Sequence, residues 1–182
     1  MNVLLVHPGP LMYTKIYLRL EPLGLELVAS AARSVGHRVT LLDLQVESQN
    51  DYVRMLHEQR PDVVGFSCNY LANVPEIVDL AKLTKQLVPG CRIFVGGHSA
   101  SFVATAILEH ADGAIDCVMK GEGEPVIGPL LEAIGGVQGN LGLVPGAVTL
   151  LFCLFRKDIK TWMRMVFDWR GILLFVAIAA PW

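Results

Sequence analysis

The sequence predicts an α/β fold with five parallel strands, because short apolar runs alternate with segments of helical periodicity. The central runs, 63–66, 93–95 and 117–119, contain no charged residue. Such runs are typical of strands that helices cover on both faces. Strands are predicted at 2–6, 38–42, 63–67, 92–96 and 116–120. With right-handed crossovers they form a Rossmann-like or flavodoxin-like sheet, for which we expect the strand order 2-1-3-4-5.

The first two helices are predicted from proline and glycine punctuation. Pro22 suits the first turn of a helix that Gly36 closes. Its expected core face consists of apolar residues four positions apart, namely Leu23, Leu27, Ala31 and Val35. A short helix is expected from about 51 to 59, stopped by Arg60-Pro61.

The remaining helices carry capping and proline signals. Asn73 followed by Glu76 resembles a capping box at the start of the third helix, which ends before Pro89. The fourth helix is expected to share one stripe among Val103, Ala106, Ile107 and His110. Pro125 can open the last helix, but Pro129 lacks the N–H that would bond to the carbonyl of Pro125. A kink or a later start is therefore expected there.

Small and polar residues follow three consecutive strands where each strand ends. They form the clusters Ser67-Cys68-Asn69, Gly96-Gly97-His98-Ser99 and Gly121-Glu122-Gly123-Glu124. Because α/β proteins bind ligands at the carboxyl ends of parallel strands, these clusters predict a ligand platform. The glycines remove side chains where the main chain would meet a broad cofactor. For any single glycine pair, a tight strand-to-helix turn is an equally good explanation.

Composition excludes several functions. A formal net charge of -2 lacks the basic excess of a nucleic-acid-binding surface. Cys68, Cys91, Cys117 and Cys153 have no C-x-x-C spacing, so neither a zinc nor an iron–sulfur site is predicted. Free cysteines in or beside strands favour a reducing cytoplasm. The apolar run at 1–6 is too short for a secretory signal.

Five segments carry a resemblance to a known family. They are Pro22-Leu23-Gly24-Leu25, Gly36-His37-Arg38-Val39, the run 61–67, the run 95–101, and Lys120-Gly121-Glu122-Gly123-Glu124. Over residues 1–136 the chain resembles the cobalamin-binding domain of B12-dependent radical SAM proteins. That group includes methyltransferases and the anaerobic magnesium-protoporphyrin ester cyclase. The joint occurrence of the five segments is fairly specific.

The resemblance implies a cobalamin cofactor whose benzimidazole base has left the cobalt. In B12 domains generally, a serine after the third strand and a double glycine after the fourth line the slot for the nucleotide tail. Ser67 and Gly96-Gly97 match them, whereas Asn69 stands where the pattern prefers leucine. The implied cofactor-binding residues are Ser67, Cys68, Asn69, Tyr70, Leu71, Gly96, Gly97, His98, Ser99, Gly121, Glu122 and Gly123.

Two departures from related families limit the chemistry. Methionine-synthase-like domains carry D-x-H-x-x-G after the first strand, and its histidine coordinates cobalt. His7 matches that histidine without the carboxylate that would orient it, so it is a weak candidate for a cobalt ligand. The chain has no C-x-x-x-C-x-x-C, so we expect no iron–sulfur cluster in it. We expect a cobalamin carrier without turnover of its own, serving a missing or separate radical SAM or methyltransferase subunit.

Residues 137–182 differ in character from the preceding domain. Apolar runs at 150–155 and 172–182 flank a basic, aromatic stretch, and acidic residues almost vanish. Neither run reaches the roughly 20 residues of a membrane-spanning helix. A membrane-surface segment, a partner-docking helix, and a truncated or frameshifted tail without an evolved role are the explanations considered. We favour the last two.

Two alternative functions use the same topology. A nucleotide- or flavin-binding domain would cradle phosphates in the glycine loops, but no G-x-G-x-x-G follows the first strand. A receiver-like interaction module would need a phosphorylatable Asp43 and an acidic cluster after the first strand, and that cluster is missing. Asp43 also suits a strand-ending or helix-capping role.

Overall fold

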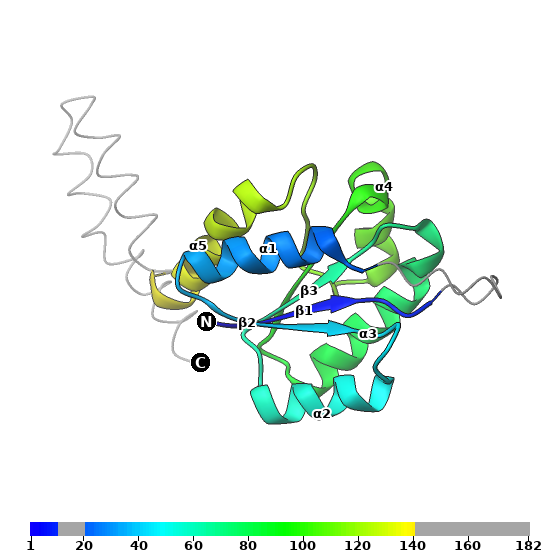
Figure 1. Ribbon diagram of the computed structural model, residues 1–182, viewed down its shortest axis with the longest axis horizontal. Helices are drawn as coiled ribbons and strands as arrows, with labels where there is room; N and C mark the ends of the chain where they lie inside the picture. Colours follow the sequence, from blue (N-terminus) through cyan, green and yellow to red (C-terminus); the bar gives the residue numbers. More distant parts are fainter. Residues whose placement is uncertain (11–20, 141–182) are drawn as a thin grey trace, which may run out of the picture. The chain divides into compact units, whose positions relative to one another are not determined.

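The described residues of a computed structural model, 1–10 and 21–140, contain a five-stranded parallel sheet (Figure 1). Its order is β2-β1-β3-β4-β5. The strands are β1 (Asn2–His7), β2 (Arg38–Asp43), β3 (Val63–Ser67), β4 (Arg92–Gly96) and β5 (Cys117–Val118). The predicted order and parallel pairing are confirmed, although β5 is shorter than the predicted range 116–120.

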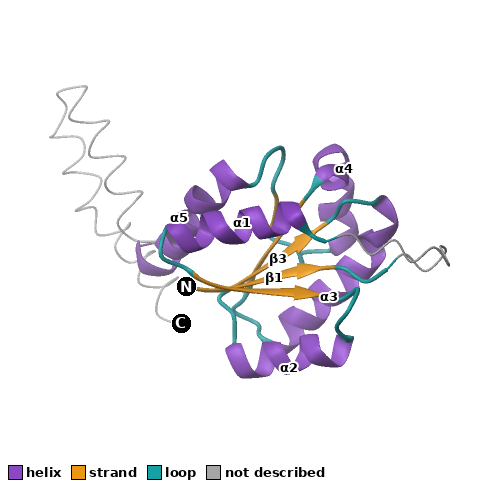
Figure 2. Cartoon of the chain, in the orientation of Figure 1, coloured by secondary structure: helices purple, strands orange, loops and turns teal. Residues whose placement is uncertain are grey.

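Five helices connect or follow these strands within the described residues. They are α1 (Leu23–Ser34), α2 (Gln49–Gln59), α3 (Val74–Leu87), α4 (His98–Ala111) and α5 (Glu124–Asn140), with a short 3₁₀ helix η1 (Leu71–Asn73) before α3. Helices α1 and α5 lie on the opposite side of the sheet from α2 and α3 (Figure 2). Helix α4 packs into the same core as α2 and α3.

The strand alternation creates one hydrophobic core on each face of the sheet. In β1, Leu4 and Val6 join the core under α2, α3 and α4, whereas Val3 and Leu5 join the core under α1 and α5. This is the period-two pattern of a pleated strand buried on both faces. The core under α1 and α5 also contains Phe94 from β4.

The buried face of α1 differs from the predicted one. Leu23, Leu27 and Val35 are exposed, and the buried residues are Leu25, Val28, Ala29 and Ala32. These four recur at i, i+3, i+4 and i+7, so they also form a helical stripe. The helix has two apolar stripes, and periodicity alone cannot say which one faces the sheet. The small side chains of Ala29 and Ala32 let α1 approach the sheet closely.

Asn73 and Glu76 do not form the predicted capping box. Asn73 has helical backbone angles and makes no side-chain cap hydrogen bond. Its Nδ2 donates to the carbonyl oxygen of Gly9 at 3.2 Å, and Glu76 Oε1 accepts from the Gly9 amide at 2.9 Å. The two side chains therefore hold the loop after β1. The capping box of the domain lies instead at Ser48 and Asp51, which start α2 earlier than predicted.

Helices α4 and α5 also correct details of the predictions. In α4, Ala106 and His110 are exposed, and the backbone of Val103 departs from helical angles, so the predicted stripe breaks. The buried residues of α4 are Ala100, Ala104, Ile107 and Ala111. Helix α5 starts at Glu124 and runs through Pro129, so the predicted later start is wrong.

The chain divides into two units, Met1–Ile134 and Gly135–Trp182. The predicted domain end at residue 136 falls inside α5, and most of the predicted tail, 141–182, lies outside the described residues. No helix in the described part of the chain is long and apolar enough to cross a membrane.

Gly65 in β3 offers a test of the core under α1. A Cβ atom at Gly65 would lie 2.2 Å from Cζ of Phe94, so we expect Gly65→Ala to lower the free energy of unfolding by about 1–3 kcal/mol. Phe94→Leu in the same chain should recover part of the loss. The matched control is Gly90→Ala, because no atom of residues 1–10 or 21–140 lies within 4 Å of a Cβ there. Urea unfolding followed by circular dichroism measures all four chains. A loss below about 0.5 kcal/mol would contradict the expected clash.

Candidate functional site

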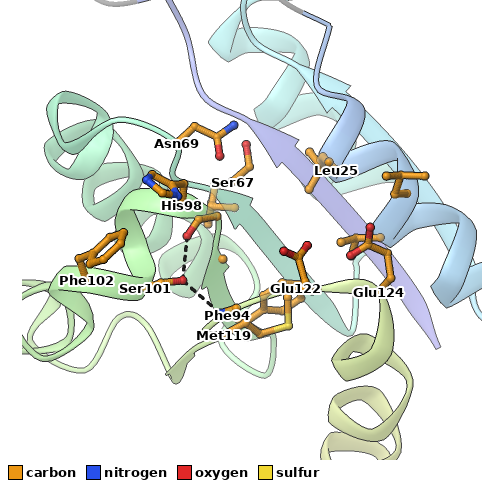
Figure 3. A pocket seen from close by; sticks show the side chains of 18 residues that line it. Leu25, Ser67, Asn69, Phe94, His98, Ser101, Phe102, Met119, Glu122 and Glu124 are labelled. Atoms are coloured by element: carbon orange, nitrogen blue, oxygen red, sulfur yellow. Dashed lines mark hydrogen bonds between the residues drawn. The ribbon is translucent and has the colours of Figure 1, made fainter.

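A cavity of about 460 Å³ opens at the carboxyl ends of β3, β4 and β5, beside α1 (Figure 3). Its volume falls within the roughly 300–1,000 Å³ typical of small-molecule sites. It is lined by Gly24, Leu25, Leu27, Val28, Phe66, Ser67, Asn69, Phe94, Gly96, Gly97, His98, Ser101, Phe102, Met119, Gly121, Glu122, Gly123 and Glu124. All three predicted polar clusters therefore contribute to one site.

Apolar side chains from the core form the deep part of the cavity. Phe94 and Met119 are buried, and Leu25 and Val28 of α1 pack in the same core. The Phe94 ring lies over Gly65, where only a residue without a side chain leaves room for it. A flat apolar group entering the cavity would thus meet a ring, a thioether and two aliphatic side chains.

Gly97 shapes the mouth of the cavity between β3 and β4. Its φ of 105° is a conformation that side chains disfavour. A Cβ atom there would also lie 2.9 Å from the carbonyl oxygen of Cys68. The neighbouring Gly96 differs, because a Cβ atom there would meet only Met119 on the cavity side, at 3.3 Å. Gly97 is thus required by the backbone, whereas Gly96 keeps space open.

Ser101 joins the loops after β4 and β5. Its hydroxyl donates to the carbonyl oxygen of Gly97 at 3.3 Å and accepts from the amide of Gly121 at 3.2 Å, as the dashed lines of Figure 3 show. Gly121 has a φ of 80°, which glycine adopts readily. The serine therefore fixes one rim of the cavity through both glycine loops.

Gly123 lets the loop after β5 approach α1. A Cβ atom at Gly123 would lie 2.6 Å from Cγ2 of Val28, so a larger residue would push the two segments apart. Glu124 follows as the first residue of α5, where the partial positive charge of a helix N-terminus favours a carboxylate. This explains the small and acidic alternation at 121–124 in part.

The start of α4 is not arranged to bind phosphate. The amides of Ser99 and Ala100, which a phosphate would need, both donate to the carbonyl oxygen of Cys68, at 3.1 and 3.3 Å. Among the residues that the structure describes, the cavity lining contains Glu122 and Glu124 and no lysine or arginine. This argues against the nucleotide-binding alternative.

A buried histidine contacts a residue that lines the cavity. His7 ends β1 and Ser67 ends β3, and His7 Nδ1 lies within hydrogen-bond distance of Ser67 Oγ, at 2.8 Å. Burial lowers the pKa of His7 below its ordinary value, while the carboxylates of Asp43 and Glu76 oppose that shift. Ser67 lines the cavity and His7 does not.

Comparison with known proteins assigns the chain to a family. The model of the B12 binding domain matches residues 9–130. The chain belongs to the B12-binding domain family. It is a cobalamin-binding module, as the sequence resemblance implies, and its topology is that of the family.

Three relatives place this B12-binding domain in context. It is 59% identical over 150 residues to the hopanoid C-3 methylase of Methylococcus capsulatus. This match covers 82% of the chain and 29% of the relative. It is 28% identical to the cytidylyl-2-hydroxyethylphosphonate methyltransferase of Streptomyces wedmorensis, over 74% of the chain and 29% of the relative. The cobalamin-dependent S-adenosylmethionine radical enzyme OxsB with aqua-cobalamin bound shares the fold, with a TM-score of 0.63 and 20% identity over 74% of the chain and 19% of OxsB. The chain thus spans less than a third of each curated relative.

The structure brings most of the predicted site residues together. The cavity-lining ones are Ser67, Asn69, Gly96, Gly97, His98, Gly121, Glu122 and Gly123. The other four do not line it. Cys68 is buried, which raises its pKa to about 11, and Tyr70 and Leu71 are exposed beyond it. Ser99 turns its hydroxyl to the carbonyl oxygen of Asn69.

The apolar part of the site was not predicted from the sequence. Phe94 was identifiable, because it lies two positions before Gly96 and so shares its face of β4. The contributions of Leu25 and Val28 depend on which stripe of α1 faces the sheet, which the sequence left ambiguous. No group of three metal-ligating side chains gathers within the described residues, and no finding tests His7, the weak candidate for a cobalt ligand.

The burial of His7 predicts a pH-dependent stability. A histidine whose folded pKa is below its unfolded value binds fewer protons when folded, so stability falls as the pH drops below about 6.5. His7→Asn should remove this contribution, so the difference in unfolding free energy between wild type and variant should shrink from about pH 8 to about pH 5.5. Urea unfolding across that range measures it. Parallel curves for the two chains would contradict the prediction.

Proposed function

We propose that the chain binds cobalamin with its base released from cobalt, and that the cavity beside α1 takes the benzimidazole-bearing tail. The observation that carries the proposal is the joint occurrence of an apolar floor and a mouth formed by Gly96 and Gly97. The flat, mostly apolar benzimidazole ring suits a cavity with this floor and this volume.

The residues that line the cavity suit the benzimidazole tail. Phe94 and Met119 would contact an inserted ring from the sheet, and Leu25 and Val28 would contact it from α1. Ser67 would supply a hydroxyl beside the ring, and Gly96 would let the tail pass over the main chain. These residues bind the tail and exclude water from it.

The rim of the cavity suits the corrin ring. His98 and Phe102 form an edge-to-face aromatic pair with ring centroids 5.1 Å apart, and Phe102 is 76% exposed. Leu27 adds an exposed apolar side chain from α1. These side chains would contact a broad ring that rests on the strand ends. Bound cobalamin would supply cobalt-centred methyl-transfer or radical chemistry.

The partner of this module would be a radical SAM or methyltransferase component. The two curated relatives are named as a methylase and a methyltransferase, and the chain corresponds to 29% of each. The remainder of such a protein, or a separate subunit, would supply the catalytic groups. The module would present the cofactor and have no turnover alone.

Reconstitution tests the proposed binding mode. The full chain incubated with hydroxocobalamin and passed through gel filtration should retain a corrin absorption band with base-off character. Its affinity should exceed that for cobinamide, which lacks the nucleotide tail, by at least about tenfold, or about 1.4 kcal/mol. Equal affinities for the two corrinoids would overturn burial of the tail. Retention of a yellow flavin in place of the corrinoid would favour the alternative function.

A glycine substitution tests the position of the tail. Gly96→Leu should lower cobalamin affinity by at least about tenfold, because its side chain would project toward Met119 and fill the cavity. The matched control is Gly90→Leu, in open space away from the cavity, which should bind as wild type does. Gly97 is unsuited to this test, since its φ of 105° would strain any substitution. Unchanged affinity in Gly96→Leu, with the fold intact by circular dichroism, would place the tail elsewhere.

A further inference from the structure

The carboxyl ends of two neighbouring strands, β1 and β3, place a histidine next to the serine of the cavity. In the sheet, His7 of β1 pairs with Asp43 of β2, and Ser67 of β3 pairs with Gly96 of β4. His7 and Ser67 point to the face of the sheet that α1 covers, as Val3, Leu5 and Val63 do. The imidazole therefore sits one strand behind the hydroxyl that lines the cavity.

The proton on His7 decides what Ser67 can offer to a ligand. A neutral imidazole has one N–H, and a hydroxyl has one hydrogen to donate. If His7 Nδ1 is unprotonated, the Ser67 hydroxyl donates to it and presents only lone pairs to the cavity. If Nδ1 carries the proton, it donates to Ser67 Oγ, and the Ser67 hydrogen is free to point into the cavity.

The chemistry of the tail selects the second state. The benzimidazole nitrogen that has left the cobalt has a lone pair and no hydrogen, so it can only accept. If the Ser67 hydroxyl donates its hydrogen to His7, only its oxygen lone pairs face the lone pair of this nitrogen, and the two repel each other. The two hydrogen bonds, from His7 to Ser67 and from Ser67 to the tail, can form together only with the proton on Nδ1.

We propose that His7 is a positioning residue for the tail: its Nδ1–H donates to Ser67 Oγ and thereby directs the Ser67 hydrogen to an acceptor atom of the tail. This inference rests on the proposed function, because it needs the tail in the cavity. His7 acts through Ser67 and does not itself line the cavity.

The surroundings of His7 suit a role that depends on proton placement. Asp43 and Glu76 are the carboxylates that act on the ring, from β2 and from α3. Glu76 is held by the amide of Gly9 at 2.9 Å, which fixes one of these charges near the end of β1. Burial keeps the imidazole from bulk water, so its hydrogen bond with Ser67 is not exchanged for one with solvent.

Amide variants of the full chain separate positioning from packing. His7→Asn places an amide group near the position of Nδ1, His7→Gln places one near Nε2, and His7→Leu has none. Dissociation constants for hydroxocobalamin and cobinamide are measured by absorption titration at about pH 8, well above the ordinary histidine pKa. Urea unfolding shows which variants are folded, and the Asn and Gln comparison remains decisive if His7→Leu is not.

We expect a loss of cobalamin affinity that requires both the Ser67 hydroxyl and the nucleotide tail. His7→Leu and His7→Gln should weaken cobalamin binding about three- to tenfold, and His7→Asn should stay within about twofold of wild type. Cobinamide binding should not change. In a Ser67→Ala background the His7 substitutions should cause no further loss, since the hydroxyl through which His7 acts is absent.

Three results would overturn the positioning role while leaving the proposed function intact. The first is wild-type cobalamin affinity in His7→Gln. The second is a loss of cobalamin affinity on substituting His7 that is as large in the Ser67→Ala background as in the wild-type chain. The third is a loss of cobinamide affinity as large as the loss of cobalamin affinity. A protein nitrogen signal in the electron paramagnetic resonance spectrum of the cobalt(II) form that His7→Leu abolishes would also overturn it, because His7 would then be a cobalt ligand. Equal affinity of the wild-type chain for both corrinoids would instead overturn the proposed function itself.

Discussion

The face of the sheet under α1 is shaped by side chains that are missing. The Phe94 ring can lie over Gly65 because Gly65 has no Cβ atom, and the loop after β5 reaches α1 because Gly123 has none. Gly96 then leaves the space above Met119 open. A parallel sheet covered on both faces normally fills such space with branched side chains. Here the same close packing leaves a cavity at the strand ends, so the site is a consequence of how the core under α1 is built.

This construction gives the two faces of the sheet different cores. On the opposite face, Tyr52 and Thr84 are fully buried and hydrogen-bonded to each other, and the core there is continuous under α2, α3 and α4. The α1 side instead combines a smaller core with glycine loops that Ser101 ties together. Glycine in a strand gives up packing and conformational entropy, and the continuous core across the sheet offsets that cost.

The polar groups at the strand ends are held by the protein before any cofactor binds. The Ser67 hydroxyl is hydrogen-bonded to His7, the backbone carbonyl of Asn69 accepts from the Ser99 hydroxyl, and the amides at the start of α4 donate to the carbonyl oxygen of Cys68. Binding groups that are already oriented lose less entropy when a ligand arrives. Some apolar side chains of this region are instead exposed to solvent. Leu23 and Leu27 of α1, and Val35 directly after it, lie outside the core face of the helix.

The sequence by itself determined the strands and the edge of the sheet where the site lies, because apolar runs and glycine punctuation are local signals. Their parallel pairing and order followed from the alternation of strands with helices, which favours right-handed crossovers and a doubly wound sheet. The sequence also identified Ser67, Gly96 and Gly97 as part of that site, through the family resemblance. The tertiary structure alone decided which stripe of α1 is buried, and therefore that Leu25 and Val28 form a cavity wall. It alone showed that His7 is hydrogen-bonded to Ser67, and that Asn73 and Glu76 are hydrogen-bonded to the loop after β1. Each of these contacts joins residues far apart in the chain, and no local periodicity or capping pattern records which distant partner a side chain will meet.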